Sequence, residues 1–174
     1  RKLTSEEIFD GIVMHVYRDT VQLPNGNTAT REVNRHIGAV CVVPVTDEGN
    51  VILERQYRYP MDMVFTEIPA GKLDSPDEDR LSAAKRELEE ETGYRAENWT
   101  DMGIYYPTVA YCDEKITMYL ATGLTKGERH LDDDEFLNVF EMPIKDAVDA
   151  ILRGEFTDGK TQAAILKAYM LLNS

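Results

Sequence analysis

Short apolar runs broken by turn residues dominate the first 70 positions of the chain. Residues 38–45 are apolar and rich in β-branched side chains, and a polar turn separates them from a second apolar run at 51–53. Both runs predict strands, and residues 65–71 predict a third, short strand that ends at a Pro/Gly break. Further strand-like runs lie at 102–106, 116–121 and 136–140.

Three segments follow a helical period instead. Leu81, Ala84 and Leu88 recur near helical spacing, and Gly93 suits the end of that helix. Residues 75–78 (SPDE) resemble a capping box, in which the Ser75 side chain accepts from the N–H of Glu78 at the start of the helix. Residues 144–153 and 159–172 predict two closing helices.

The N-terminal segment predicts a β-hairpin. Apolar and polar positions alternate around residues 12–17, and Asn25-Gly26 marks a tight turn before a second extended stretch. A two-stranded hairpin is marginally stable alone in water, so residues 1–35 should pack on the main domain or on a second subunit. The second subunit is favoured, which leaves residues 36–174 as the main domain.

The order of these elements indicates the fold class. Strands bracket helices without regular β-α-β alternation, which favours an α/β fold with a mixed sheet and helices on both faces over a doubly wound parallel sheet. The length of 174 residues fits one domain with a small appendage. No apolar run approaches twenty residues, so a membrane-spanning helix is not expected.

Charge and cysteine content narrow the class of partner. The formal net charge of −13 argues against sequence-independent binding to nucleic acid or to anionic membranes, both of which require clustered Lys and Arg. Cys41 and Cys112 lie far apart in apolar surroundings, as in a reduced protein, and the first residues lack the apolar core of a secretory signal. A cytoplasmic protein is expected.

Three glutamates in the first predicted helix are the strongest chemical signal. Glu87, Glu90 and Glu91 follow i, i+3 and i+4 spacing, so their carboxylates share one helix face and repel one another unless a positive group lies among them. A glutamate-rich face is often only solvated surface. Oxygen ligands without a nearby His or Cys cluster suit Mg²⁺, with Mn²⁺ possible, rather than Zn²⁺.

The framing of these glutamates resembles the signature of the Nudix hydrolases. Gly71 and Glu78 precede a run that matches in register at Arg86, Glu87, Leu88, Glu90, Glu91, Gly93 and, loosely, Tyr94. Six residues separate Gly71 from the first glutamate, where the family usually has five, so Asp77 and Glu78 compete for that position. Glu78 is preferred, because the helix fixes its distance from Arg86 while a loop absorbs an insertion.

The resemblance extends over nearly the whole chain and is greatest to the ADP-ribose pyrophosphatase and nucleoside-diphosphate-sugar hydrolase branch. It implies a Nudix-type α/β/α sandwich fold. The segments that carry it are 23–26 (LPNG), 55–58 (RQYR), 67–71 (EIPAG) and 113–114 (DE). At 107–111 Val109-Ala110 stands where ADP-ribose hydrolases commonly have Pro-Gly. This branch implies a homodimer formed through the N-terminal region.

The resemblance also implies roles for the signature residues. Glu87 and Glu91 are the expected principal metal ligands, Glu90 is a further ligand or a base, and the Ala70 carbonyl is a backbone ligand. Arg86 is expected to pair with Glu78 and so hold the loop against the helix, a task that suits the guanidinium fork better than an ammonium.

Other positions are expected to bind substrate or move a proton. Arg55 and Arg58 are three apart on a strand and cannot both face one side, so one of them is expected to reach a substrate phosphate, unless both are structural. The 67–71 segment adds Glu67 to the substrate-binding set. Glu135 is the candidate general base, with Asp133 second, although the 131–136 stretch also fits an exposed acidic loop.

The function that these expectations support is Mg²⁺-dependent hydrolysis of the pyrophosphate bond of a nucleoside diphosphate sugar. ADP-ribose, or a related sugar nucleotide such as GDP-mannose, would yield a nucleoside monophosphate and a sugar phosphate. Two alternatives are a catalytically silent nucleotide-binding regulatory module and a hydrolase of capped RNA. The three intact glutamates argue against the first, and the absence of a basic tract argues against the second.

Overall fold

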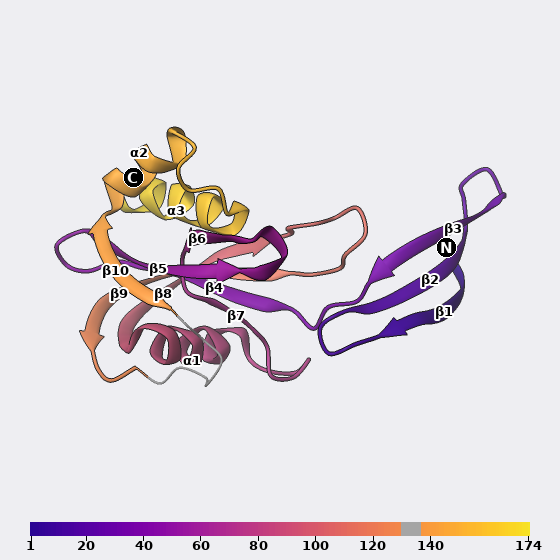
Figure 1. The fold of residues 1–174 in the computed structure, drawn as a ribbon, viewed down its shortest axis with the longest axis horizontal. Coiled ribbons are helices and arrows are strands. Elements are labelled where there is room, and N and C mark those ends of the chain that lie inside the picture. The colour runs from indigo at the N-terminus through magenta and orange to yellow at the C-terminus, as the bar shows by residue number, and fades with distance from the viewer. Residues whose placement is uncertain (130–136) are drawn as a thin grey trace.

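The computed structural model describes residues 1–129 and 137–174 as a layered body with a separate N-terminal sheet that projects from it (Figure 1). The projecting sheet is an antiparallel meander of β1 (Lys2–Asp10), β2 (His15–Gln22) and β3 (Thr28–Asn34). The predicted two-stranded hairpin is therefore incomplete, because one further strand precedes it.

The pattern of side chains explains this error. Every residue of β1 is exposed, so the strand has no buried face from which a period of two could be recognised. Ile12 and Met14, which the alternation assigned to a strand, lie in the connection between β1 and β2. The Asn25-Gly26 turn is correctly placed between β2 and β3, and Gly26 has the positive φ of 86° that such a turn requires.

The body contains two sheets. One has the strand order β7 (Ala70–Lys72), β4 (Ala39–Pro44), β9 (Ile116–Lys126), β8 (Tyr94–Tyr105), and the other has the order β10 (Asn138–Pro143), β5 (Asn50–Arg58), β6 (Met63–Glu67). A short 3-10 turn, η1 (Tyr59–Met61), joins β5 to β6. Strands β4 and β9 are parallel and the other named pairs are antiparallel, which confirms the mixed sheet.

Helices cover both faces, so the predicted α/β/α arrangement is confirmed (Figure 1). Strand β4 is buried throughout, and its alternate side chains serve the two layers. Val40 and Val42 pack in the cluster that includes Leu88 of α1 (Arg80–Thr92). Cys41 and Val43 pack in the cluster of α2 (Ile144–Leu152) and α3 (Gly159–Leu172). None of the described helices is both long and apolar enough to cross a membrane.

The start of α1 differs from the expected capping box. Asp79, not Ser75, is the N-cap: its carboxylate accepts from the Ser82 N–H at 2.9 Å. The Glu78 N–H does donate to Ser75, but to the backbone carbonyl at 3.2 Å within a turn. At the other end, Gly93 closes the helix with φ of 74°, as predicted.

Candidate active site

One face of α1 carries a positive charge among its carboxylates. Arg86 Nη1 donates to Glu87 at 2.8 Å and to Glu90 at 3.1 Å. Glu87 and Glu91 are buried, whereas the Glu90 side chain is 43% exposed. The guanidinium therefore reduces the repulsion that three carboxylates on adjacent turns would otherwise suffer.

Arg86 also connects the preceding loop to the helix. Of the two candidates for the first acidic residue of the signature, Asp77 and Glu78, it is Glu78 that Arg86 contacts. Arg86 Nε lies 3.3 Å from Glu78 Oε1, and the Asp74 N–H donates to Glu78 Oε2 at 2.7 Å. These two contacts, the amide first, hold the pKa of Glu78 below its usual value. Burial opposes the charge on Arg86, but its hydrogen bonds to Glu78 and Glu87 raise its pKa overall.

Strand β7 lies directly against this carboxylate face. The Ala70 N–H donates to Glu91 Oε2 at 2.9 Å, so the Ala70 amide, and not only its carbonyl, belongs to the site. At Gly71 a Cβ would lie 2.1 Å from the carboxyl carbon of Glu87, a distance that no real side chain tolerates. The absence of a side chain at Gly71 is thus what makes room for the Glu87 carboxylate.

These elements enclose a cleft of about 590 Å³, which we call the carboxylate cleft. Its walls include Glu87, Glu90 and Glu91 from α1, Ala70–Lys72 from β7, and Arg58 from the end of β5. The oxygen donors suit a hard cation such as Mg²⁺. Within residues 1–129 and 137–174, however, no three His, Cys, Asp or Glu side chains are already arranged around a common point that could hold a metal ion. Arg86 occupies part of the carboxylates' hydrogen-bonding capacity.

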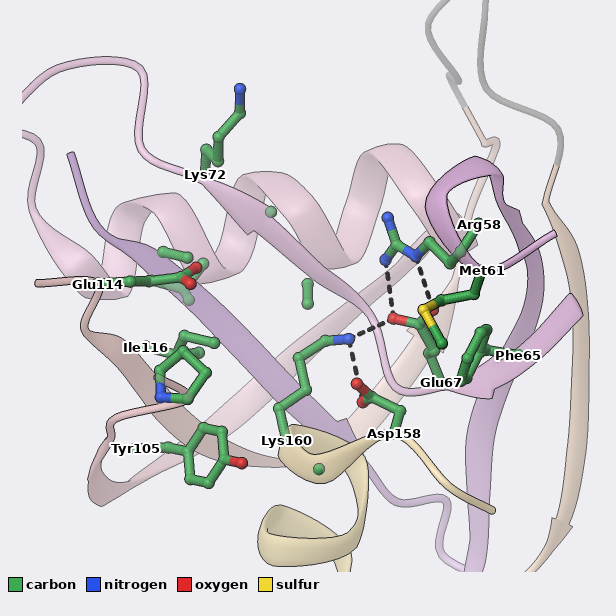
Figure 2. A pocket seen from close by; sticks show the side chains of 16 residues that line it. Arg58, Met61, Phe65, Glu67, Lys72, Tyr105, Glu114, Ile116, Asp158 and Lys160 are labelled. Carbon is green, nitrogen blue, oxygen red and sulfur yellow. Dashed lines mark hydrogen bonds and ion pairs between the residues drawn. The ribbon is translucent and has the colours of Figure 1, made fainter. Parts of the chain in front are cut away.

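A second cleft of about 520 Å³, shown in Figure 2, shares β7 with the first as part of its wall. It shares Arg58 and Ala70–Lys72 with the carboxylate cleft, and its other walls combine apolar and charged side chains. Phe65, Tyr105 and Ile116 supply apolar surface, and Glu114 and Lys160 supply charge. A ligand with a polar centre and a ring at one end matches this lining.

Arg58 is held at the junction of the two clefts by a buried carboxylate. Its Nε and Nη2 each donate to Glu67 at 2.7 Å, the two-pronged geometry that suits a guanidinium (Figure 2). Lys160 also donates to Glu67, and it contacts Asp158 at 3.1 Å. Burial raises the pKa of Glu67, but Arg58 and Lys160 outweigh it and lower that pKa overall.

The alternative arginine, Arg55, lies elsewhere. Its guanidinium carbon is 4.3 Å from the centre of the Phe140 ring, and Arg55 lines neither the carboxylate cleft nor the second cleft. Instead it borders a third hollow near α2 with Arg153 and Phe156. Spacing of three along β5 places Arg55 and Arg58 on opposite faces, and Arg58 is the one directed to the clefts.

Two residues with a place at the second cleft, Lys160 and Asp158, were absent from the sequence-based candidates. They lie more than ninety positions after Glu67, so no spacing relates them to it. The available signal was an acidic residue before the predicted helix 159–172: Asp158 is its N-cap and accepts from the Thr161 N–H at 2.9 Å. The proposed bases Glu135 and Asp133 fall within 130–136, outside the described residues.

The comparisons with known proteins decide the family. The NUDIX domain family matches residues 35–164, and the nucleoside diphosphate sugar hydrolase N-terminal domain matches residues 1–34. The chain belongs to the Nudix family. A solved structure described as an ADP compounds hydrolase has the same fold, with a TM-score of 0.88, 24% sequence identity, and coverage of 99% of this chain and 94% of that chain.

Curated relatives of this Nudix chain carry more than one name. An ADP-ribose pyrophosphatase of Bacillus subtilis (strain 168) is 41% identical over 167 residues, which are 95% of this chain and 90% of that protein. A methanol dehydrogenase activator of Bacillus methanolicus is 40% identical over the same shares. An ADP-ribose pyrophosphatase of Mycobacterium tuberculosis is 34% identical over 96% of this chain and 82% of its own.

Proposed function

We propose that this chain hydrolyses the pyrophosphate bond of a nucleoside diphosphate sugar, ADP-ribose or a relative such as GDP-mannose, to a nucleoside monophosphate and a sugar phosphate. Names of relatives support this choice, among them a GDP-mannose pyrophosphatase of Pectobacterium atrosepticum that is 29% identical over 187 aligned positions. Relatives of similar sequence identity have different names, so the names alone do not select an activity, and the proposal is based on the site. Three carboxylates line one wall of a cleft that Arg58 also lines.

The charges of that cleft suit a diphosphate. A pyrophosphate bond resists hydrolysis largely because its anionic oxygens repel a nucleophile, so its cleavage depends on placing positive charge around it. Arg58 is held by Glu67 with its side chain still 41% exposed, and we assign it to a substrate phosphate. Glu67 then acts as the support of Arg58, and Arg55 has no part in binding.

A divalent cation is the second source of positive charge in this proposal. We assign Glu87 and Glu91 as its principal ligands, with Glu90 as a further ligand or a base and the Ala70 carbonyl as a backbone ligand. Mg²⁺, or Mn²⁺ in its place, would neutralise phosphate oxygens and lower the pKa of water at the site. Arg86 donates to Glu87 and Glu90 and so balances part of their negative charge, while its contact with Glu78 keeps the loop in place. Glu135 is retained as a candidate base.

The second cleft extends the substrate site. Because Arg58 and Ala70–Lys72 border both clefts, a diphosphate beside Arg58 would direct one of its two substituents toward Phe65 and Tyr105. The mixed lining suits a ring that bears hydroxyl groups. We therefore place the diphosphate at the junction and one end of the sugar nucleotide in the second cleft.

We also propose that residues 1–35 form a homodimer contact and that residues 36–174 form the hydrolase domain. The N-terminal sheet and its first connection expose several large apolar side chains, which in a monomer would stay in water: Leu3, Ile8, Phe9, Ile12, Val13 and Met14. The unpaired Cys41 and Cys112 support a cytoplasmic location, where thiols stay reduced.

A substrate panel tests the proposed activity. Purified protein is incubated with ADP-ribose, GDP-mannose, UDP-glucose or dinucleoside polyphosphates and Mg²⁺ in ¹⁸O-labelled water, and the products are identified by mass. We expect a nucleoside monophosphate and a sugar phosphate, one of which carries the label. If no sugar nucleotide of the panel is hydrolysed in the presence of Mg²⁺, the catalytically silent regulatory module becomes the better hypothesis.

Carboxylate variants test the site itself. Glu90→Gln and Glu91→Gln should each lower kcat by about 100-fold or more, since each removes a charge from the carboxylate cleft. Glu89→Gln, on the same helix but paired with Arg95, is the matched control and should stay within about threefold. Full Mg²⁺-dependent activity in both cleft variants would refute the assignment. Nanomolar binding of capped RNA at physiological salt would instead favour the RNA substrate.

A further inference from the structure

Four charged side chains, Arg58, Glu67, Lys160 and Asp158, form a continuous row along the wall of the second cleft (Figure 2). Arg58 donates twice to Glu67, Lys160 donates to Glu67 and to Asp158, and Asp158 caps α3 through the Thr161 N–H and hydroxyl. Exposure decreases from Arg58, at 41%, to Glu67, at 3%, with Lys160 at 12%. Arg58 is thus the most exposed of these three side chains and lines both clefts, whereas Lys160 is mostly buried and lines the second cleft alone.

The sharing of Glu67 affects how much positive charge Arg58 presents. A buried carboxylate paired only with Arg58 would largely cancel the guanidinium charge near a ligand. Here one carboxylate is shared by two cations, Arg58 and Lys160. The negative charge of Glu67 therefore cancels less of the positive charge of Arg58 than it would in a simple pair. The far end of the row is compensated separately, because Asp158 accepts hydrogen bonds from the first turn of α3, where the helix dipole is positive.

The backbone that carries Lys160 is fixed by its neighbours. Lys160 lies in the first turn of α3, whose Thr161 is fully buried and accepts from the Ile68 N–H at 3.1 Å. Gly159 precedes it in a position where a Cβ would lie 2.6 Å from the Tyr105 hydroxyl. Contacts with the segment after β6 and with β8 therefore fix the backbone that carries Lys160.

We infer that Lys160 is a positioning residue for substrate binding. Through Glu67 it holds the Arg58 guanidinium in its orientation and leaves part of the positive charge of Arg58 available to the substrate. The inference rests on the proposed role of Arg58 at a substrate phosphate. Lys160 does not touch the reacting atoms. Its loss should weaken the binding of a diphosphate and leave the chemical step nearly unchanged.

The test combines kinetics with direct binding. For Lys160→Met we expect the KM for ADP-ribose and the dissociation constant for ADP, measured by calorimetry, to rise about fivefold, while kcat stays within about twofold. Lys145→Met is the matched control, since Lys145 is an exposed lysine on α2 that pairs with Asp149. It should change neither constant.

A double-variant cycle shows whether Lys160 acts through Glu67. In a Glu67→Gln background, Lys160→Met should raise the ADP dissociation constant by less than about twofold, because the intermediate group no longer carries charge. An undiminished fivefold effect would mean that Lys160 contacts the ligand directly and would overturn the inference. A lower Tm with unchanged KM and ADP affinity would assign Lys160 a purely structural role and also overturn it.

Two further measures keep the result interpretable. If Lys160→Met does not fold, Lys160→Gln removes the charge but keeps a hydrogen-bond donor, and the same constants are compared. Calorimetry requires no turnover, so a wild-type protein that binds ADP or GDP but cleaves no sugar nucleotide of the panel would refute the proposed function alone. A wild-type protein that binds neither ADP nor GDP would refute both.

Discussion

Gly71 shows how a single hydrogen atom in place of a side chain can determine a site. Replacing it by alanine would put a methyl group 2.1 Å from the Glu87 carboxyl carbon, and either β7 or Glu87 must then move. We expect Gly71→Ala to reduce kcat/KM for ADP-ribose at least about tenfold, by displacing a proposed metal ligand. Steady-state kinetics over a range of Mg²⁺ concentrations measure the loss.

Gly154→Ala is the control for this substitution. Gly154 follows α2 and has φ of 76°, and a methyl group added there would meet no heavy atom within 4 Å, so alanine costs backbone strain alone. It should lower the free energy of unfolding by about 1 kcal/mol and leave kcat/KM unchanged. Equal kinetic losses in the two variants would show that the contact with Glu87 is not the cause.

Arg86 tests whether charge alone suffices at the centre of the carboxylate face. Its guanidinium reaches Glu78, Glu87 and Glu90 together, and a lysine ammonium cannot span the three. Arg86→Lys should therefore lower kcat about tenfold or more. Arg95→Lys, which changes an exposed arginine paired with Glu89, should have little effect in the same assay.

The buried row also predicts a dependence of stability on pH. The pKa of Glu67 lies below its ordinary 4.5, so its contribution is present above pH 4.5 and is lost as pH falls through the folded-state pKa. The pKa of Lys160 lies above its ordinary 10.5, because Glu67 and Asp158 outweigh the opposing effect of burial. Its contribution is therefore present below pH 10.5 and is lost as pH rises through the folded-state pKa.

Urea unfolding of wild type and Lys160→Met measures this dependence. Near pH 7 the variant should be less stable by about 2 kcal/mol, the typical value of a charged hydrogen bond. The difference should shrink as pH falls from 4.5 toward the lower folded-state pKa of Glu67, and as pH rises from 10.5 toward the higher folded-state pKa of Lys160. A difference that stays constant from pH 4 to 11 would show that lost packing, rather than charge, explains the effect.

At this scale the sequence predicts contacts within a local motif and misses those that depend on the fold. The resemblance to the Nudix signature implied that Arg86 would meet Glu78, which lies in the turn just before the helix that carries Arg86. The choice between Arg55 and Arg58 needed the orientation of β5, which a three-residue spacing leaves open. Lys160 reaches Glu67 only after α3 packs against β6, so no local pattern predicted it.

Among the elements, α1 positions most of the site, and its N-cap sets where it begins. Asp79→Ala should cost about 1 kcal/mol of stability, because it removes the acceptor for the Ser82 N–H. Ser75→Ala is the paired control and should cost less than about 0.5 kcal/mol, since Ser75 contributes its backbone carbonyl to the turn. Thermal unfolding of both variants distinguishes the two capping assignments. The reverse order of costs would support the capping box at Ser75.

Elements with a buried face were predicted well from the sequence, whereas elements without one were not. Strand β4, buried throughout, and α3, with Gly159 at its start, match the apolar patterns closely. Strand β1 is exposed along its whole length and is fixed by pairing with β2, so hydrophobic periodicity could not reveal it. The error about the helix cap arose because the Glu78 side chain accepts hydrogen bonds from the Asp74 N–H and from Arg86, and not from a helix terminus.

At the scale of the whole molecule, the projecting sheet predicts association. Wild type should sediment as a dimer, and Phe9→Asp, at a 57% exposed apolar position of β1, should shift it toward monomer. Leu152→Asp changes a leucine that is still more exposed, at 74%, but lies at the end of α2 away from that sheet. It should leave the sedimentation coefficient unchanged. A monomeric wild type would refute the dimer.

The sheet and the body meet through a small set of polar contacts. Arg35 bridges Asp19 of β2 and Asp113 at 2.9 and 3.0 Å, and the Asn34 N–H donates to the Tyr111 carbonyl. Among the described residues, none of the three strands of the sheet contributes to either buried apolar cluster of the body. We therefore expect the sheet to gain much of its order from whatever covers its exposed apolar residues.

The loop between β7 and α1 bears on how this protein could change over evolutionary time. One end is held by Gly71 against Glu87, and the other by Glu78, which Arg86 and the Asp74 amide bind together. With both ends anchored, an added residue between them lengthens a surface turn at a small cost in entropy and leaves the carboxylates of α1 where they are. We therefore expect this loop to tolerate insertions and deletions, so that its length can vary without loss of the site.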